Sequence, residues 1–311
     1  MSISSLRQKI KPWMLPIAML MGILLHNYIG YVAFLSKYLI FIMLLITYCR
    51  VQMRDLKGGP YIWWVLAVQI VGSVGVYLLL LPFNAILAQG AFICIFCPTA
   101  TAAPVITGML GGKVGRVATY SLFSHISVAV LAPILLSWMT EGEPGSESIS
   151  FGESVWMIAV TVLPLILGPL ALALLLERFA PKVRCGIANH QGLSFYIWAV
   201  ALLIVVGNSV SFILKEPAEM IPEILMLSVV SFLACIAQFA TGRKIGGHYG
   251  DKISAAQSLG QKNTVFAIWL SLTYLNPIVS VAPAAYVAWH NTINSLQIYR
   301  HEKAHKPSNR K

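Results

Sequence analysis

The sequence predicts an all-α membrane protein with ten transmembrane helices. Of its 311 residues, 58% are hydrophobic and only 11% are charged, whereas a soluble domain carries roughly 25% charged residues. The charges fall in short clusters between long apolar runs. Because so few charges cannot cover a water-facing surface on a chain of this length, we expect lipid to surround most of it.

Ten apolar runs are long enough to cross a bilayer, since a span needs about 20 mostly apolar residues. The segments between them are short and polar, and none suggests a soluble domain, so residues 1–311 are expected to form one transmembrane unit. The predicted spans are 13–30, 33–48, 61–81, 83–110, 117–139, 154–176, 193–214, 221–240, 253–274 and 278–298.

The placement of lysine and arginine predicts the orientation of these spans, because cytoplasmic segments of membrane proteins are enriched in both. With the N-terminal side inside, the cytoplasmic segments hold all but three of the 22 basic residues, the exceptions being Lys37, Lys215 and Lys262. We therefore expect a multi-pass protein of the inner (plasma) membrane with both termini cytoplasmic. The net charge of +11 belongs to these short segments and does not indicate nucleic-acid binding.

Lys262 is the one basic residue in the middle of a predicted span, and no Asp or Glu lies deep in any of the ten runs. A lysine in this position costs roughly 3 kcal/mol or more in lipid and is a functional hypothesis by default. The alternative is a side chain that extends to the membrane interface. The length of span on both sides of Lys262 favours the functional interpretation.

Two spans are interrupted at comparable places in the two halves of the chain. The fourth contains Pro98 and Pro104 with small and hydroxyl residues between them, and the ninth contains the polar run 257–264. Matched breaks of this kind indicate a transporter's midplane site, and ordinary kinks are the alternative. The freed N–H groups attract anions, and the freed carbonyls attract cations. The residues expected near the site are Thr99, Thr101, Gln261, Asn263 and Thr264.

These motifs resemble those of the bile acid:sodium symporter family, over essentially the whole chain. In that family the fourth span reads C-P-G-G-T-A-S-N and the ninth reads E-x-G-x-Q-N-S. A W-H-N tripeptide in the tenth span is matched by Trp289, His290 and Asn291, and a glutamine in the third span is matched by Gln69. The resemblance adds Pro104, His290 and Asn291 to the expected substrate-binding residues.

The resemblance implies a fold of two inverted five-helix repeats with two broken helices that cross. A panel domain would comprise about 13–48 and 154–214, and a core domain about 61–139 and 221–298. It also implies a secondary transporter that works by alternating access on an organic anion, with two sodium ions behind the crossing.

The sequence departs from the family where sodium binds. The family's ninth-span glutamate falls on Ser258 and its glutamine on Lys262, while Gln69 and Ser121 keep oxygen-bearing side chains. Sodium prefers hard oxygen ligands, and the carboxylate among them is missing here. We therefore expect sodium-independent transport, in which the Lys262 ammonium stands where one sodium ion would sit. It is expected to donate to carbonyls at the fourth-span break and to Gln69, with Ser121 and Ser258 as the other ion-site positions.

The same residues also fit other functions. A buried lysine that loses its proton in one conformation would couple transport to protons, and a sodium-coupled symporter or a membrane ligand sensor would share the fold. His125 is interpreted as a hydrogen-bonded packing residue and, alternatively, as a proton relay. Cys94 and Cys97 are interpreted as packing thiols and not as a metal or redox pair.

No enzyme, cofactor or metal is expected from this sequence. It contains no H-E-x-x-H, no G-x-S-x-G and no paired carboxylates within the predicted spans, which are the patterns that intramembrane hydrolysis would need. The expected partners are a small organic anion and the lipid bilayer.

Overall fold

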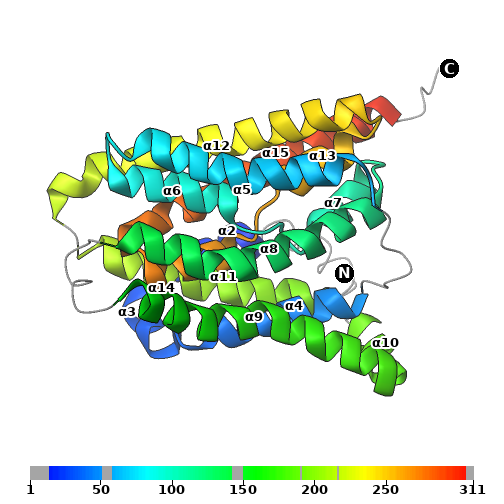
Figure 1. Ribbon diagram of the computed structural model, residues 1–311, viewed down its shortest axis with the longest axis horizontal. Helices are drawn as coiled ribbons and strands as arrows, with labels where there is room; N and C mark the ends of the chain where they lie inside the picture. Colours follow the sequence, from blue (N-terminus) through cyan, green and yellow to red (C-terminus); the bar gives the residue numbers. More distant parts are fainter. Residues whose placement is uncertain (1–13, 51–57, 142–149, 190, 216, 306–311) are drawn as a thin grey trace, which may run out of the picture. The chain divides into compact units, whose positions relative to one another are not determined.

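A computed structural model describes residues 14–50, 58–141, 150–189, 191–215 and 217–305, and these residues are all-α (Figure 1). They form 14 α-helices and short 3-10 turns, with no strand among them. The all-α prediction is therefore confirmed for this part of the chain. Part of the charge pattern behind the predicted orientation lies outside the described residues, namely Arg7, Lys9, Lys11, Arg54, Lys57, Lys306, Arg310 and Lys311.

Each predicted span coincides with one helix or with two consecutive helices. The first span corresponds to two helices, α2 (Met14–Leu24) and α3 (His26–Ile29). Six further spans each correspond chiefly to one long helix, and these helices are α4 (Leu35–Arg50), α5 (Tyr61–Leu80), α8 (Val114–Thr140), α9 (Phe151–Phe179), α11 (Gln191–Ile213) and α12 (Ile221–His248). The last span is α15 (Val281–His305), and α10 (Pro181–Asn189) is an additional short helix. Several helices run past the apolar residues that predicted them, as α12 does through Arg243 and Lys244.

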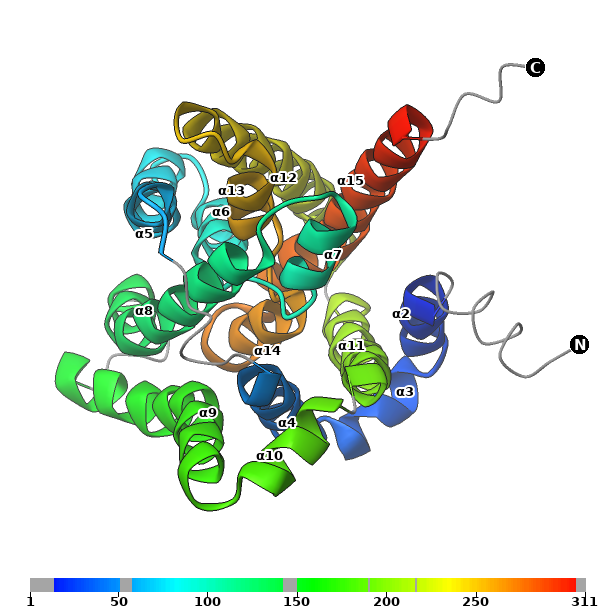
Figure 2. The same ribbon diagram turned by 90° about the vertical axis from the view of Figure 1, so that its right-hand side faces the viewer.

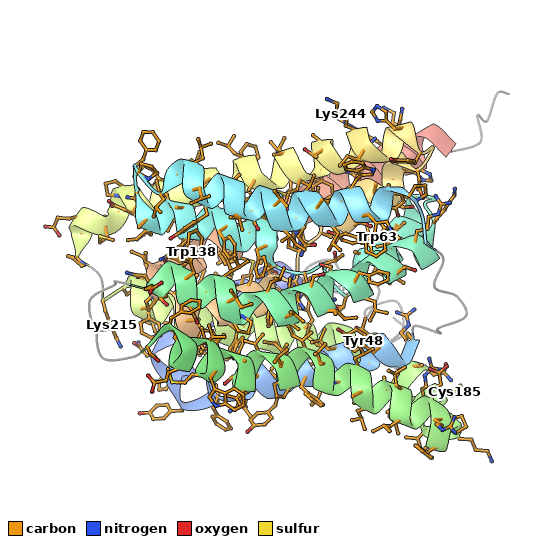
Figure 3. The ribbon with its side chains drawn as sticks, in the orientation of Figure 1. Tyr48, Trp63, Trp138, Cys185, Lys215 and Lys244 are labelled. Atoms are coloured by element: carbon orange, nitrogen blue, oxygen red, sulfur yellow. The ribbon has the colours of Figure 1, made fainter. Side chains whose placement is uncertain are left out.

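The lengths and compositions of these helices are those of a multi-pass membrane protein. Within the described ranges, five helices are long and apolar enough to cross a membrane, or six when the bent pair His26–Val32 and Leu35–Arg50 is taken as one span. Large apolar side chains project from their outer faces (Figure 3), and Trp63 is 61% exposed. Charged side chains such as Lys244 lie at helix ends.

The helices group into two compact units. The first comprises Met1–Val51, Ala129–Ile224 and Val265–Val281. Within it α2 and α11 pack closely. At Gly22 there is no room for a side chain, since its first carbon would lie 2.6 Å from the carbonyl oxygen of Leu203. Its helix α9 begins with a capping box, in which the Ser150 hydroxyl accepts from the Glu153 N–H and the Glu153 carboxylate accepts from the Ser150 N–H.

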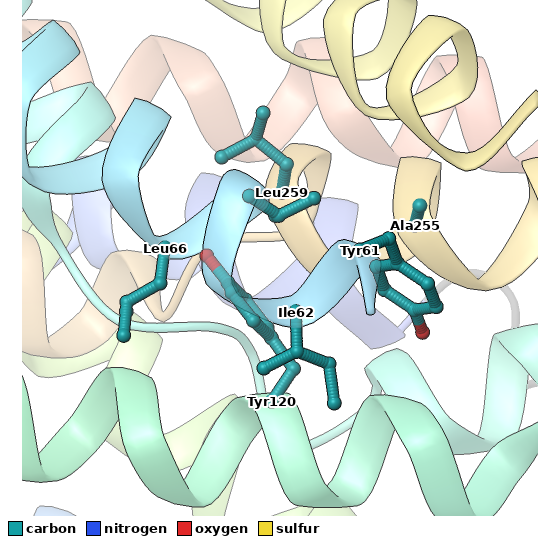
Figure 4. Packing of buried hydrophobic residues seen from close by; sticks show 7 residues of the cluster. Tyr61, Ile62, Leu66, Tyr120, Ala255 and Leu259 are labelled. Atoms are coloured by element: carbon teal, nitrogen blue, oxygen red, sulfur yellow. The ribbon is translucent and has the colours of Figure 1, made fainter. Parts of the chain in front are cut away.

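The second unit comprises Gln52–Val128, Leu225–Thr264 and Ala282–Lys311, and it contains both predicted breaks. Its helices α5, α6 (Ala85–Phe96), α12, α13 (Lys252–Gly260) and α15 lie together in both views (Figures 1 and 2). An apolar cluster joins α5, α8 and α13 (Figure 4). Its members are Tyr61, Ile62, Val65, Leu66, Tyr120, Ala255 and Leu259.

Polar contacts fix the start of α13 in the same unit. The Arg116 guanidinium forms an ion pair of 2.9 Å with the carboxylate of Asp251, the residue before α13. The backbone N–H of Lys113 donates to the Ser254 hydroxyl at 2.7 Å. At Gly242 a side chain would meet the carbonyl oxygen of Ala255, so α12 and α13 approach each other through backbone. These contacts and the apolar cluster determine where the C-terminal end of α13 lies.

Candidate functional site

Both predicted breaks are present. In the first, α6 ends at Phe96 and α7 (Ala103–Met109) begins after six intervening residues. Cys97 leaves the helical conformation with φ −55° and ψ 148°, as expected for a residue that precedes a proline. Pro104, however, is a helical residue at the start of α7, where the missing N–H costs nothing. Pro104 therefore stands where the second half of the interrupted span begins.

The second break is shorter than the polar run that predicted it. Helix α13 continues through Gln257 and Ser258 to Gly260, and α14 (Thr264–Tyr274) begins after three residues. Gln261 is extended, with φ −88° and ψ 118°. Polar side chains in a buried helix do not themselves interrupt its backbone, which explains the difference.

The two breaks pair with each other through one isolated antiparallel bridge. Thr99 lies opposite Lys262 in an isolated bridge. The Ala100 N–H donates to the Gln261 carbonyl at 3.1 Å, and the Asn263 N–H donates to the Pro98 carbonyl at 2.8 Å. Backbone groups released from the helices are therefore satisfied inside the protein, as an apolar surrounding requires.

The Lys262 ammonium lies on the C-terminal end of α6. The residue is 1% exposed, and Nζ donates to the carbonyl oxygens of Ile95 at 2.6 Å and Cys97 at 3.1 Å. A helix C-terminus carries partial negative charge and accommodates a cation. The side chain does not extend to an interface, which excludes that alternative. Among the described residues Lys262 forms no ion pair with a carboxylate.

Gln69 contacts the same helix end, but it does not accept from Lys262. Its Nε2 donates to the Phe96 carbonyl at 2.7 Å, and its Oε1 accepts from the hydroxyls of Tyr120 and Ser124. The predicted bond between Lys262 and Gln69 is therefore wrong. Two hydroxyls from α8 already occupy the amide oxygen, and neither stood out in the sequence.

The C-terminal end of α13 is bound in a corresponding way by hydroxyl groups. The Thr99 hydroxyl donates to the Ser258 carbonyl at 2.8 Å, and the Tyr286 hydroxyl donates to the Gly260 carbonyl at 2.8 Å. Gln238 donates through Nε2 to the Tyr286 hydroxyl at 2.9 Å and to the Cys94 carbonyl at 3.2 Å. Neither Tyr286 nor Gln238 is among the residues expected from the sequence. Gln238 carried a usable signal, because it is a polar residue within an apolar run.

The expected substrate-binding residues at the breaks differ in how their side chains are engaged. Gln261 donates to the Gln257 side chain at 2.8 Å. Thr264, the first residue of α14, is 1% exposed, and its hydroxyl has no hydrogen-bond partner among the residues that the structure describes. Asn263 is buried, and Thr101 is half-buried. The structure thus brings Thr99, Gln261 and Asn263 together at the paired breaks, with Thr264 next in the chain.

The two residues expected from α15 lie on different faces of that helix. His290 is 2% exposed, and its Nδ1 has no hydrogen-bond partner within the described part of the chain. Its ring packs edge-on against that of Tyr286, with ring centroids 5.6 Å apart. The Asn291 amide instead donates to the carbonyl of Val287 on its own helix at 2.7 Å. Asn294 follows His290 by one turn and is also buried with an unpartnered Oδ1. It is a candidate that the sequence did not single out.

The remaining ion-site position and the other polar groups are buried and locally bonded. Ser121 is 6% exposed, and its carbonyl contacts His125 Nδ1 at 2.7 Å, which supports the packing interpretation of His125. Cys94 and Cys97 are buried free thiols. Within the described ranges no group of His, Cys, Asp or Glu side chains is arranged to hold a metal ion.

No protein-family model matches this chain, and no curated protein shows significant similarity to it. Its function is therefore inferred from the paired breaks and the buried charge.

Proposed function

We propose that this chain is a secondary transporter of a small organic anion, working by alternating access and independently of sodium. The proposed architecture is ten spans in two inverted five-helix repeats, resembling the bile acid:sodium symporter family. The proposed location is a bacterial-type inner membrane, with both termini in the cytoplasm. Its chemistry is binding and movement of a solute, without a catalytic step.

One observation carries this proposal: the Lys262 ammonium is held by backbone carbonyls where two interrupted helices pair. It donates to Ile95 and Cys97 oxygens, which are the kind of hard ligands that a sodium ion would take. A fixed ammonium in this place supplies the positive charge without an ion from solution. The proposal therefore assigns Lys262 the position of one sodium ion.

The charge at the paired breaks favours an anion over a cation or a neutral solute. Lys262 contributes +1, and within the described residues no carboxylate pairs with it. In the resembling family, one glutamate and two sodium ions give about the same net charge. Thr264 adds an unpartnered hydroxyl in the first turn of α14, where helix N–H groups also favour negative charge. Together these groups suit a carboxylate or another small oxyanion.

The solute class is tested by thermal-shift measurements on the purified protein. Organic acids, organic amines and neutral sugars of similar size are compared at equal ionic strength. The proposal predicts that only acids raise the melting temperature, because only they complement the positive charge of Lys262. Preferential stabilisation by amines or sugars would contradict it.

Transport is separated from ligand sensing with proteoliposomes. A radiolabelled form of the best-stabilising acid should exchange against the same unlabelled acid trapped inside. Saturable binding with no exchange would show a ligand sensor instead, and would overturn transport while leaving the anion site intact.

A further inference from the structure

The two helix ends at the paired breaks satisfy their last carbonyls with donors of different charge. The antiparallel pairing of Thr99 with Lys262 relates the two breaks by a local two-fold axis. Across this axis, the carbonyls of Ile95 and Cys97 at the end of α6 correspond to those of Ser258 and Gly260 at the end of α13. On α6 a single ammonium donates to both carbonyls. On α13 two neutral hydroxyls donate, one to each carbonyl.

All groups on the α13 side are buried, so water from outside does not supply these bonds. Thr99, Tyr286 and Ser258 are each 0% exposed, and Gln238 is 3% exposed. Gln238 binds the Tyr286 hydroxyl and also the Cys94 carbonyl near the end of α6. It thereby joins the α13 donor to the other helix. Gln69 and Tyr120 form a similar glutamine–tyrosine pair at the end of α6.

We infer that the Thr99 hydroxyl and the Tyr286 hydroxyl, the latter positioned by Gln238, fill a second cation position at the end of α13, so that neither helix end needs an ion from solution. Two carbonyls at a helix C-terminus form a negative, oxygen-rich site, and hydroxyl donors satisfy it without adding charge. Thr99 and Tyr286 are the donors in this account, and Gln238 is the positioning residue of Tyr286. This inference rests on the proposed sodium independence, which Lys262 alone supports, and extends it. It gives the carbonyls of the second helix end donors that replace an ion.

The inference predicts that removing these hydroxyls creates a response to monovalent cations. In the double variant Thr99→Val/Tyr286→Phe, the Ser258 and Gly260 carbonyls lose their donors while Lys262 is unchanged. Melting temperatures are measured in sodium, potassium and choline chloride at equal ionic strength. Sodium or potassium should raise the melting temperature of the double variant by roughly 3 °C or more over choline. The unmodified protein should melt at the same temperature in all three salts.

Thr107→Val is the matched control, because the Thr107 hydroxyl is equally buried but donates to the Ala103 carbonyl on its own helix. It should show no cation response. Equal melting temperatures for the double variant in all three salts would overturn the inference. If the double variant does not fold, Tyr286→Phe alone is measured against the same two outcomes.

This experiment uses no organic anion. Its failure therefore leaves the anion site untouched, whereas failure of the ligand screen leaves the cation response of the double variant standing.

Discussion

Replacing Lys262 by methionine is expected to weaken binding of the organic anion by roughly 30-fold. An ammonium about 7 Å from an anion, at an effective dielectric constant of about 20, contributes roughly 2 kcal/mol, and 1.4 kcal/mol corresponds to about tenfold in affinity. The measurement is a ligand titration of the purified variant. Lys252→Met is the matched control, because Lys252 begins α13, the helix that precedes Lys262, and is exposed. It should bind as the unmodified protein does.

The melting temperature of Lys262→Met is expected to stay close to that of the unmodified protein, although the affinity for the anion falls. The Ile95 and Cys97 carbonyls lose a donor, at roughly 1–3 kcal/mol for each unsatisfied group. Removing a buried ammonium relieves a desolvation cost of similar size, and Gln69 remains near the Cys97 carbonyl at 3.4 Å. Lys262→Gln keeps N–H donors without the charge, so it should lose affinity but retain more stability. Undiminished affinity in both variants would show that the charge does not act on the ligand.

The double variant Ser258→Glu/Lys262→Gln is expected to acquire sodium-dependent anion binding, with at least tenfold higher affinity in sodium than in potassium. The substitution removes the ammonium from the Ile95 and Cys97 carbonyls and places a carboxylate in the last turn of α13. Carbonyl and carboxylate oxygens together form a hard cation site. A tenfold effect corresponds to about 1.4 kcal/mol of coupling between the ion and the ligand.

The single variants provide the controls for this experiment. Ser258→Glu alone should show no difference in anion affinity between the two salts, because Lys262 still donates to the Ile95 and Cys97 carbonyls and leaves no vacant ion position there. Lys262→Gln alone should lack the carboxylate that a tight sodium site needs. Position 258 is fully buried, so Ser258→Asp, which adds less volume, is made alongside. Sodium independence of both double variants, with anion binding retained, would refute the equivalence of Lys262 and a sodium ion.

The features predicted correctly from sequence are those with a local signal. A proline after Cys97 interrupts α6, and a glycine followed by polar residues ends α13, so both breaks were visible in short stretches of sequence. Lys262 stood out because a charge within an apolar run is costly. The helices themselves followed from runs of apolar residues.

The partners of these groups were not predictable, because they come from helices distant in sequence. The Gln69 amide oxygen is shared by Tyr120 and Ser124, which removes it from Lys262. The Tyr286 hydroxyl reaches Gly260 only through the packing of the second unit. Asn291 illustrates the same limit. It follows the buried His290 by one residue on α15 and therefore lies on another face of the helix, where its amide donates to the Val287 carbonyl. A sequence pattern identifies the polar residue, whereas tertiary packing decides which partner it takes.

The most direct test of the role of Lys262 is the affinity of the unmodified protein for its organic anion in sodium and in potassium chloride. Isothermal titration at equal ionic strength gives both values on the same sample. Because the ammonium already occupies the carbonyls of Ile95 and Cys97, the two affinities should agree within about twofold. A tenfold or greater increase in sodium, equivalent to about 1.4 kcal/mol of coupling, would contradict the account.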